Sequence, residues 1–200
     1  MKRIYQIMAI AILSLNIACN SNKKSQEDNR QENSDKIDAP IIDKSLFLQA
    51  ALEGDVEKVS STLEAGIDIN TVDENQHTAL MLAAYNGHHH VMKVLIDKGA
   101  KIEMVDGMNR TALMFASTGP FTQAVKMLIN AGANVNATDN QEKWTPVMMA
   151  AAEGQLEVVK LLVANGADLK MVDIDGESSL DFANSNGHTA VASYIEAQLK

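Results

Sequence analysis

The sequence predicts an all-α solenoid of about five stacked helix-turn-helix units joined by hairpin loops. The main observation is a repeat, because glycines spaced 33, 33 and 34 residues apart each follow a short apolar run. These glycines are Gly66, Gly99, Gly132 and Gly166. Composition agrees, since only 4% of the 200 residues are aromatic and three are proline, whereas a β-sandwich or barrel needs aromatic and β-branched strands broken by turns.

The first segment has the pattern of a secretory signal peptide. Lys2 and Arg3 precede an almost wholly apolar run over residues 4–15. This run is shorter than the roughly 20 residues that a membrane-spanning helix needs. We therefore expect residues 1–18 to be a signal peptide that directs export.

The only cysteine of the chain, Cys19, follows the segment LNIA over residues 15–18. The segment resembles the lipobox of bacterial lipoproteins, in which the cysteine is acylated and becomes the mature N-terminus, although Asn16 stands where that family usually has leucine. The resemblance implies a lipid on Cys19 that holds the protein at a membrane of the cell envelope, facing the periplasm or the cell surface. The alternative is a free cysteine beside an ordinary cleavage site.

A polar linker separates this cysteine from the repeats. Residues 20–36 contain no apolar side chain, so they cannot bury enough surface to offset chain entropy. We expect a flexible polar tether over residues 19–42. The body over residues 43–200 holds 11 basic and 21 acidic side chains, so the acidity of the chain belongs to the folded part. This charge favours a basic protein partner and disfavours nucleic acid.

The body divides into five repeats. Their expected bounds are about 43–72, 73–105, 106–138, 139–172 and 173–200. Two residue types keep the repeat spacing, namely Asp73, Asp106, Asp139 and Asp173, followed by Thr78, Thr111, Thr145 and Ser178. A second register of turn residues runs through Gly54, Gly87, Gly119 with Pro120, Gly154 and Gly187. Each period therefore contains two short helices separated by a turn and followed by a longer loop, and the one extra residue lies between Asp139 and Thr145.

Two sets of apolar residues are expected to form the core. Small side chains in the first helices allow close approach, and they are Ala83, Ala116 and Ala150. Apolar pairs supply the buried stripe of the second helices, and they are Val94 with Leu95, Met127 with Leu128, and Leu161 with Leu162. The first and last repeats have more polar outer sides and are expected to cap the stack.

These motifs resemble the ankyrin repeat. The family pattern runs through Thr-Pro-Leu-His, Ala-Ala, Gly-His, Leu-Leu and Gly-Ala-Asp, and this chain has Thr145-Pro146-Val147-Met148, Ala83-Ala84, Gly87-His88 and Gly99-Ala100 among its matches. The resemblance covers about residues 43–200. It departs where the family histidine becomes Met81, Met114 or Met148, which implies a weaker hydrogen-bond network. It implies an L-shaped pile of helices that binds proteins through hairpin tips and the concave face.

For the histidines, methionines and aspartates that could bind a metal or act in catalysis, we prefer a structural role. His88, His89 and His90 could bind zinc or copper together with His77, but three consecutive helical residues point about 100° apart. Methionines that recur at the repeat spacing indicate packing, and the repeated aspartates suit turns whose amides they cap. We therefore expect no catalytic residue, cofactor or metal. A metal-dependent enzyme remains the alternative from another class.

The predicted partner-binding site is a groove centred on Trp144. Trp144 is the only tryptophan, it lies on the loop with the insertion, and the sequence gives it no packing role. Tryptophan, tyrosine and arginine are frequent in binding hot spots. The other predicted site residues are Arg110, Met108, His77, Tyr85, Asn75, Glu153 and Glu177. The alternative for Trp144 is an aromatic side chain folded back onto its own loop.

The sequence thus predicts a monomeric, non-catalytic protein-binding module tethered to the bacterial envelope. Two narrower roles fit the same prediction. One is a helper of a periplasmic redox enzyme such as catalase, acting in cofactor delivery or assembly. The other is an immunity protein that neutralises a toxin.

Overall fold

The computed structural model describes residues 43–200, so the expected signal peptide, the tether and Cys19 lie outside the described residues. The described chain consists of ten helices in five consecutive pairs, which confirms the predicted all-α solenoid. The helices are α1 (Lys44–Glu53), α2 (Val56–Glu64), α3 (Ala79–Tyr85), α4 (His89–Asp97), α5 (Ala112–Ser117), α6 (Thr122–Asn130), α7 (Pro146–Ala152), α8 (Leu156–Ala164), α9 (Ser179–Ser185) and α10 (Thr189–Gln198).

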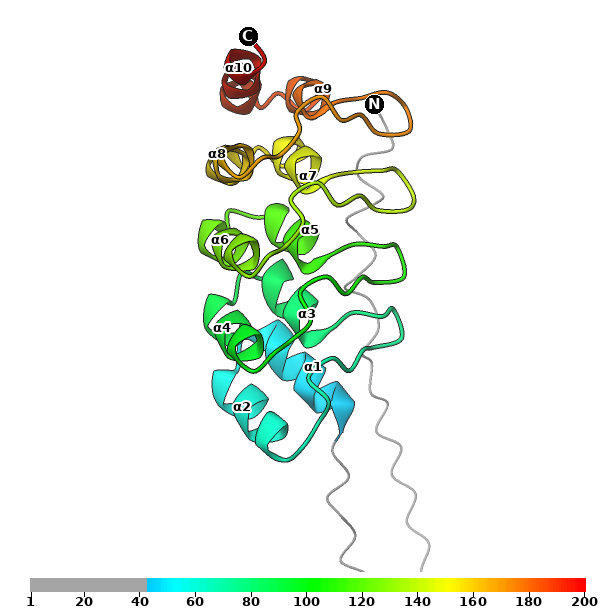
Figure 1. Ribbon diagram of the computed structural model, residues 1–200, viewed down its shortest axis with the longest axis vertical. Coiled ribbons are helices and arrows are strands. Elements are labelled where there is room, and N and C mark those ends of the chain that lie inside the picture. The colour runs from blue at the N-terminus through cyan, green and yellow to red at the C-terminus, as the bar shows by residue number, and fades with distance from the viewer. Residues whose placement is uncertain (1–42) are drawn as a thin grey trace, which may run out of the picture. The chain divides into compact units, whose positions relative to one another are not determined.

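The helices form two layers. The first helix of each pair belongs to an inner layer, which consists of α1, α3, α5, α7 and α9. The second helices stack in an outer layer on the side away from the hairpin loops (Figure 1). Hairpin loops project from the inner layer and connect each repeat to the next. We call the surface formed by the hairpins and the inner helices the inner face, which corresponds to the expected concave face.

The repeated threonines and serine begin the inner helices. Each side-chain oxygen accepts a hydrogen bond from the backbone amide three residues later, at 3.2 Å for Thr78 and 3.3 Å for Thr145. The sulfurs of Met81 and Met148 accept reciprocal bonds from the amides of these two residues, each at 3.4 Å. Because a thioether is a weak acceptor, methionine supplies a weaker version of a reciprocal cap.

Phe121, the residue before α6, shows why glycine recurs in the turns between paired helices. Gly87 has φ 67°, and a Cβ atom added there would lie 2.2 Å from the ring of Phe121. Gly119 is equally close, with a 2.3 Å approach to the same ring. Phe121 therefore packs into a space that only glycine leaves open.

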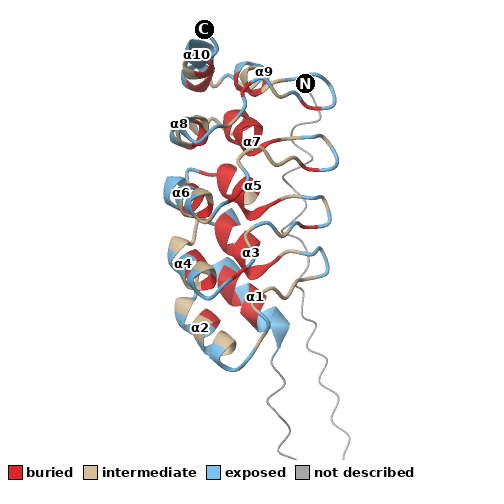
Figure 2. Ribbon diagram, viewed as in Figure 1, coloured by how far each residue is buried: buried red, intermediate tan, exposed pale blue. Residues whose placement is uncertain are grey.

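The core lies between the two layers. Ala83, Ala116 and Ala150 have no exposed surface, as predicted, and buried residues concentrate on the inner helices and on the facing sides of the outer helices (Figure 2). The expected apolar pairs of the outer helices were half right. Leu95, Leu128 and Leu162 are fully buried, but Val94, Met127 and Leu161 are only partly buried. An outer helix packs on one side only, so two adjacent positions about 100° apart cannot both point into the core.

The helices are short. The longest of those over residues 43–200, α1 and α10, have ten residues each, and none of these helices is long and apolar enough to cross a membrane.

Candidate protein-binding site

Each hairpin is organised by its first aspartate. We number the hairpins by the repeat that they open: hairpin 2 (73–77), hairpin 3 (106–110), hairpin 4 (139–144) and hairpin 5 (173–177). In hairpin 2, the Asp73 carboxylate accepts hydrogen bonds from the backbone amides of Asn75 and His77, both at 2.8 Å. Asp106, Asp139 and Asp173 accept equivalent bonds in the other hairpins. The aspartates therefore shape the turns, as expected.

Neighbouring hairpins touch through their backbones. The amide of Gly107 donates to the Asn75 carbonyl at 3.1 Å, and the amide of Asn140 donates to the Met108 carbonyl at 3.0 Å. Ile174 continues the series with a bond to the Glu142 carbonyl at 3.0 Å. Asn75 and Met108, both predicted as binding residues, thus join the hairpins through their backbone carbonyls.

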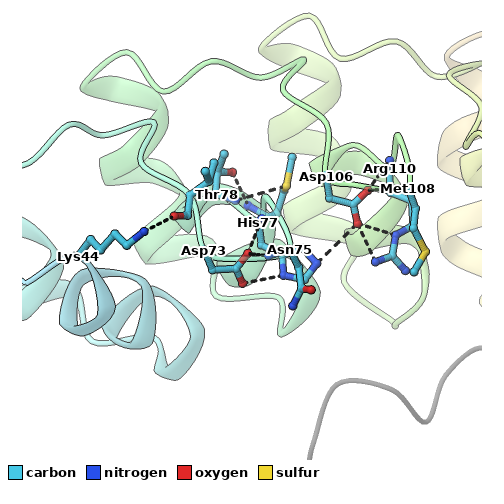
Figure 3. A network of polar contacts seen from close by, with 10 residues as sticks. Lys44, Asp73, Asn75, His77, Thr78, Asp106, Met108 and Arg110 are labelled. Carbon is cyan, nitrogen blue, oxygen red and sulfur yellow. Dashed lines mark hydrogen bonds and ion pairs between the residues drawn. The ribbon is translucent and has the colours of Figure 1, made fainter.

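His77 and Arg110 converge on one buried carboxylate (Figure 3). The Asp106 side chain is 1% exposed, and its Oδ2 atom lies 2.8 Å from Arg110 Nε and 2.7 Å from a terminal guanidinium nitrogen. His77 Nε2 lies 3.5 Å from the same oxygen, while His77 Nδ1 donates to Asp73 Oδ2 at 2.9 Å. The imidazole of His77 therefore lies between carboxylates of two successive repeats.

This arrangement shifts two pKa values. Burial opposes ionisation of Asp106, but the hydrogen bonds from His77 and Arg110 outweigh it and hold the pKa of Asp106 at about 2. The Asp106 carboxylate, assisted by Asp73, raises the pKa of His77 above its ordinary value against the opposing effect of burial.

Phe115 on α5 joins the predicted residues into one cluster. The rings of His77 and Tyr85 meet it edge to face, with centroids 5.6 Å and 6.2 Å away, and the Arg110 guanidinium lies 4.6 Å from the centre of its ring. We call Tyr85, His77, Arg110 and Phe115 the inner-face cluster. Sequence reasoning missed Phe115. The available signal was its place four residues after the capping Thr111, which matches the place of Phe182 after Ser178.

Trp144 lies in a different cluster. Its ring packs on Phe182 of the next repeat with a centroid distance of 4.5 Å, beside Met148 and Met171. The expectation that Trp144 has no packing role was therefore wrong, because Phe182 provides an aromatic surface from α9. The structure does not group Trp144 with His77 and Tyr85.

The two predicted glutamates make none of the ring contacts that define the two clusters. Glu153 is half-buried at the end of α7, and burial raises the pKa of its carboxyl, with the charge of His188 acting in the opposite direction. Glu177 is exposed in hairpin 5, where its amide donates to Asp173 at 2.8 Å.

The histidines outside the inner-face cluster have structural contacts. His88 and His188 donate to the carbonyls of Leu52 and Ala152 in the preceding repeat, each at 3.0 Å. The rings of His89 and His90 lie 4.1 Å apart. Over residues 43–200, no group of three or more His, Cys, Asp or Glu side chains is placed to hold a metal ion.

Comparison with known proteins identifies the repeats. A family model described as ankyrin repeats (3 copies) matches residues 47–139 and 122–197. Ankyrin repeat family A protein 2 of Mus musculus is 46% identical over 50 residues, which are 25% of this chain and 16% of that protein. The Notch-regulated ankyrin repeat-containing protein of Homo sapiens is 37% identical over 59 residues, or 30% of this chain and 52% of that protein.

An enzyme also contains a similar segment. Glycerophosphocholine phosphodiesterase gde1 of Schizosaccharomyces pombe is 36% identical over 61 residues, which are 30% of this chain and only 5% of that enzyme. The chain thus spans from 5% to about half of the length of these relatives. The family model covers most of the described repeats, and ankyrin repeats are protein-protein interaction modules. The chain belongs to the ankyrin-repeat family.

Proposed function

We propose that this protein binds a basic protein partner through its inner face, with the inner-face cluster as the main contact. The observation that carries the proposal is the position of Tyr85. Tyr85 is 37% exposed while its ring packs against Phe115, which is itself in contact with His77 and Arg110. An aromatic side chain that is both exposed and held in place loses little conformational freedom on binding.

Charge supports a basic partner. The four hairpins hold eight acidic and two basic side chains. Four of the acids shape the turns, and the other four are exposed or partly exposed on the hairpins, namely Glu74, Glu142, Asp175 and Glu177. A partner with a complementary positive surface would associate faster, and salt would weaken that association.

We further propose that the repeats act at the bacterial cell envelope, tethered through a lipid on Cys19. The support is the sequence pattern of residues 1–19, since these residues lie outside the described structure. A redox-enzyme helper and an immunity protein are two forms of this proposal, because each would bind another protein through the same face. Metabolic labelling with palmitate tests the tether, and Cys19→Ser should remove the label.

The binding proposal is tested by affinity capture from detergent-solubilised cell envelopes with the full chain as bait. The test variant is Tyr85→Ala, and the matched control is Leu199→Ala, a residue of similar exposure (40%) after the last outer helix. The unchanged chain and Leu199→Ala should capture the same basic protein, and Tyr85→Ala should retain less than a tenth of it. Raised salt should release the protein. The proposal is wrong if Tyr85→Ala captures it as well as the control does.

A further inference from the structure

One ion pair joins two hairpins in the described part of the chain. It connects His77 of hairpin 2 with Asp106 of hairpin 3, whereas the other ion pairs over residues 43–200 lie within one helix or one hairpin. The pair lies next to the backbone bond from Gly107 to Asn75, which joins the same two hairpins. The junction between repeats 2 and 3 thus has both a backbone contact and a side-chain contact.

The chemistry of this side-chain contact requires a proton. Both partners of the imidazole are carboxylates, Asp73 Oδ2 at 2.9 Å from Nδ1 and Asp106 Oδ2 at 3.5 Å from Nε2. An ionised carboxylate only accepts hydrogen bonds, and neutral imidazole carries a single N–H. Neutral His77 can therefore satisfy one carboxylate and must turn a nitrogen lone pair toward the other. Only the imidazolium can donate to both repeats.

The other groups around His77 leave this reasoning intact. Hairpin 2 contributes Asp73, hairpin 3 contributes Asp106 and the cationic Arg110, and α5 contributes the uncharged ring of Phe115. Arg110 opposes a second positive charge, but its guanidinium is bound to Asp106 at 2.7 Å. Because Asp106 keeps Arg110 when His77 is neutral, its carboxylate stays paired and the contact that is lost is the one between hairpins.

We propose that His77 is a proton-controlled link between repeats 2 and 3, closed when the imidazole is protonated and open when it is neutral. The neighbouring carboxylates raise the pKa of His77, so the stabilisation is complete below the ordinary histidine pKa and is lost as pH rises through the raised value. Because His77 is itself part of the inner-face cluster, opening of the link would loosen its ring contact with Phe115. The proposal stands on the hairpin contacts and holds whether or not the inner face binds a basic protein.

Hydrogen exchange at two backbone amides tests the link. Gly107 and Asn140 make equivalent bonds across successive hairpin junctions, and only the Gly107 junction has an ion pair across it among the described residues. Between pH 5.5 and 8.5, after correction for intrinsic exchange, protection of Gly107 should fall about two- to fivefold relative to Asn140, the range that a modest ion pair contributes. Equal changes at the two amides would overturn the proposal.

Variants assign the effect to His77. In His77→Gln, the ratio of protection at Gly107 to protection at Asn140 should not change with pH. The control is His88→Gln, which loses a hydrogen bond to a backbone carbonyl and should keep the pH dependence of the unchanged chain. The imidazole signal of His77 in NMR spectra should titrate at lower pH in Asp106→Asn. This titration and the ratio in the unchanged chain remain decisive if His77→Gln fails to fold. An unshifted titration, or a Gln variant that keeps the pH dependence, would show that no such link exists.

Discussion

Removal of the Trp144 side chain should destabilise the C-terminal end of the stack. Complete truncation of a buried tryptophan costs about 3–5 kcal/mol. Trp144 is only partly buried, so Trp144→Ala should lower the free energy of unfolding by about 2 kcal/mol. Phe182 is 2% exposed, and Phe182→Leu, which removes the ring but keeps much of the volume, should cost about 1 kcal/mol.

The contact between the two rings makes these effects interdependent. Their centroids are 4.5 Å apart, and an aromatic pair contributes about 0.5–1.5 kcal/mol beyond burial. The double variant should therefore lose about 1 kcal/mol less than the sum of the single losses. Urea unfolding followed by far-ultraviolet circular dichroism measures all four proteins, since Trp144 is the only tryptophan and its fluorescence is lost on substitution.

Additive effects would refute this reasoning. If the single losses sum to the double loss within about 0.3 kcal/mol, the rings do not pack on each other and Trp144 is a free surface residue. If the two losses are instead coupled, Trp144→Ala lowers the stability of the protein as well as removing a surface side chain. This is why Tyr85, whose ring is more exposed, is the sharper choice for the binding test.

Three other features of the structure predict the effects of four substitutions. The pKa of Asp106, about 2, lies below the ordinary 3.8, so its ionised carboxylate contributes up to about 2 kcal/mol to the free energy of unfolding. This contribution is complete above pH 4 and is lost as pH falls toward 2. Asp106→Asn should therefore flatten the acid unfolding curve over that range. Ser179 has a buried hydroxyl without a partner at the position that Pro146 occupies in α7, so Ser179→Pro should raise stability by about 0.5–1 kcal/mol in thermal unfolding. Lys143 has the left-handed φ of 63°, which glycine adopts more easily, so Lys143→Gly should stabilise the protein by up to about 1 kcal/mol in urea unfolding. Gly176 has φ 83° and open space around an added Cβ, so Gly176→Ala should destabilise the protein by a similar amount through backbone strain alone.

The repeat period accounts for how much of the fold the sequence predicts. A residue type that returns every 33 or 34 positions must occupy the same local structure each time, so the spacing alone places Thr78 and Thr145 at helix starts and Ala83 in the core. The period does not tell which of two adjacent apolar residues, such as Val94 and Leu95, is the buried one, because this depends on which side of an outer helix faces its neighbours.

The candidate site was harder to predict because its contacts cross between repeats. His77 meets Phe115, and Trp144 meets Phe182, so in both cases the residue before one capping position contacts a ring 38 residues later, four places beyond the next capping position. Local motifs place both members of each pair, but only the stacking register brings them together.

Arg110 makes a different contact from His77 and Trp144, although it occupies the same position of its repeat. The residue of the next repeat that corresponds to their partner rings is Met149, which has no ring. Arg110 instead lies over Phe115 of its own repeat, 4.6 Å from the ring centre, while its guanidinium binds Asp106. The cation therefore reaches the same ring that His77 approaches from the preceding repeat. This is why the side chains that combine charge with aromatic surface gather at repeats 2 and 3, whereas Trp144 and Phe182 form a packing contact farther along the stack.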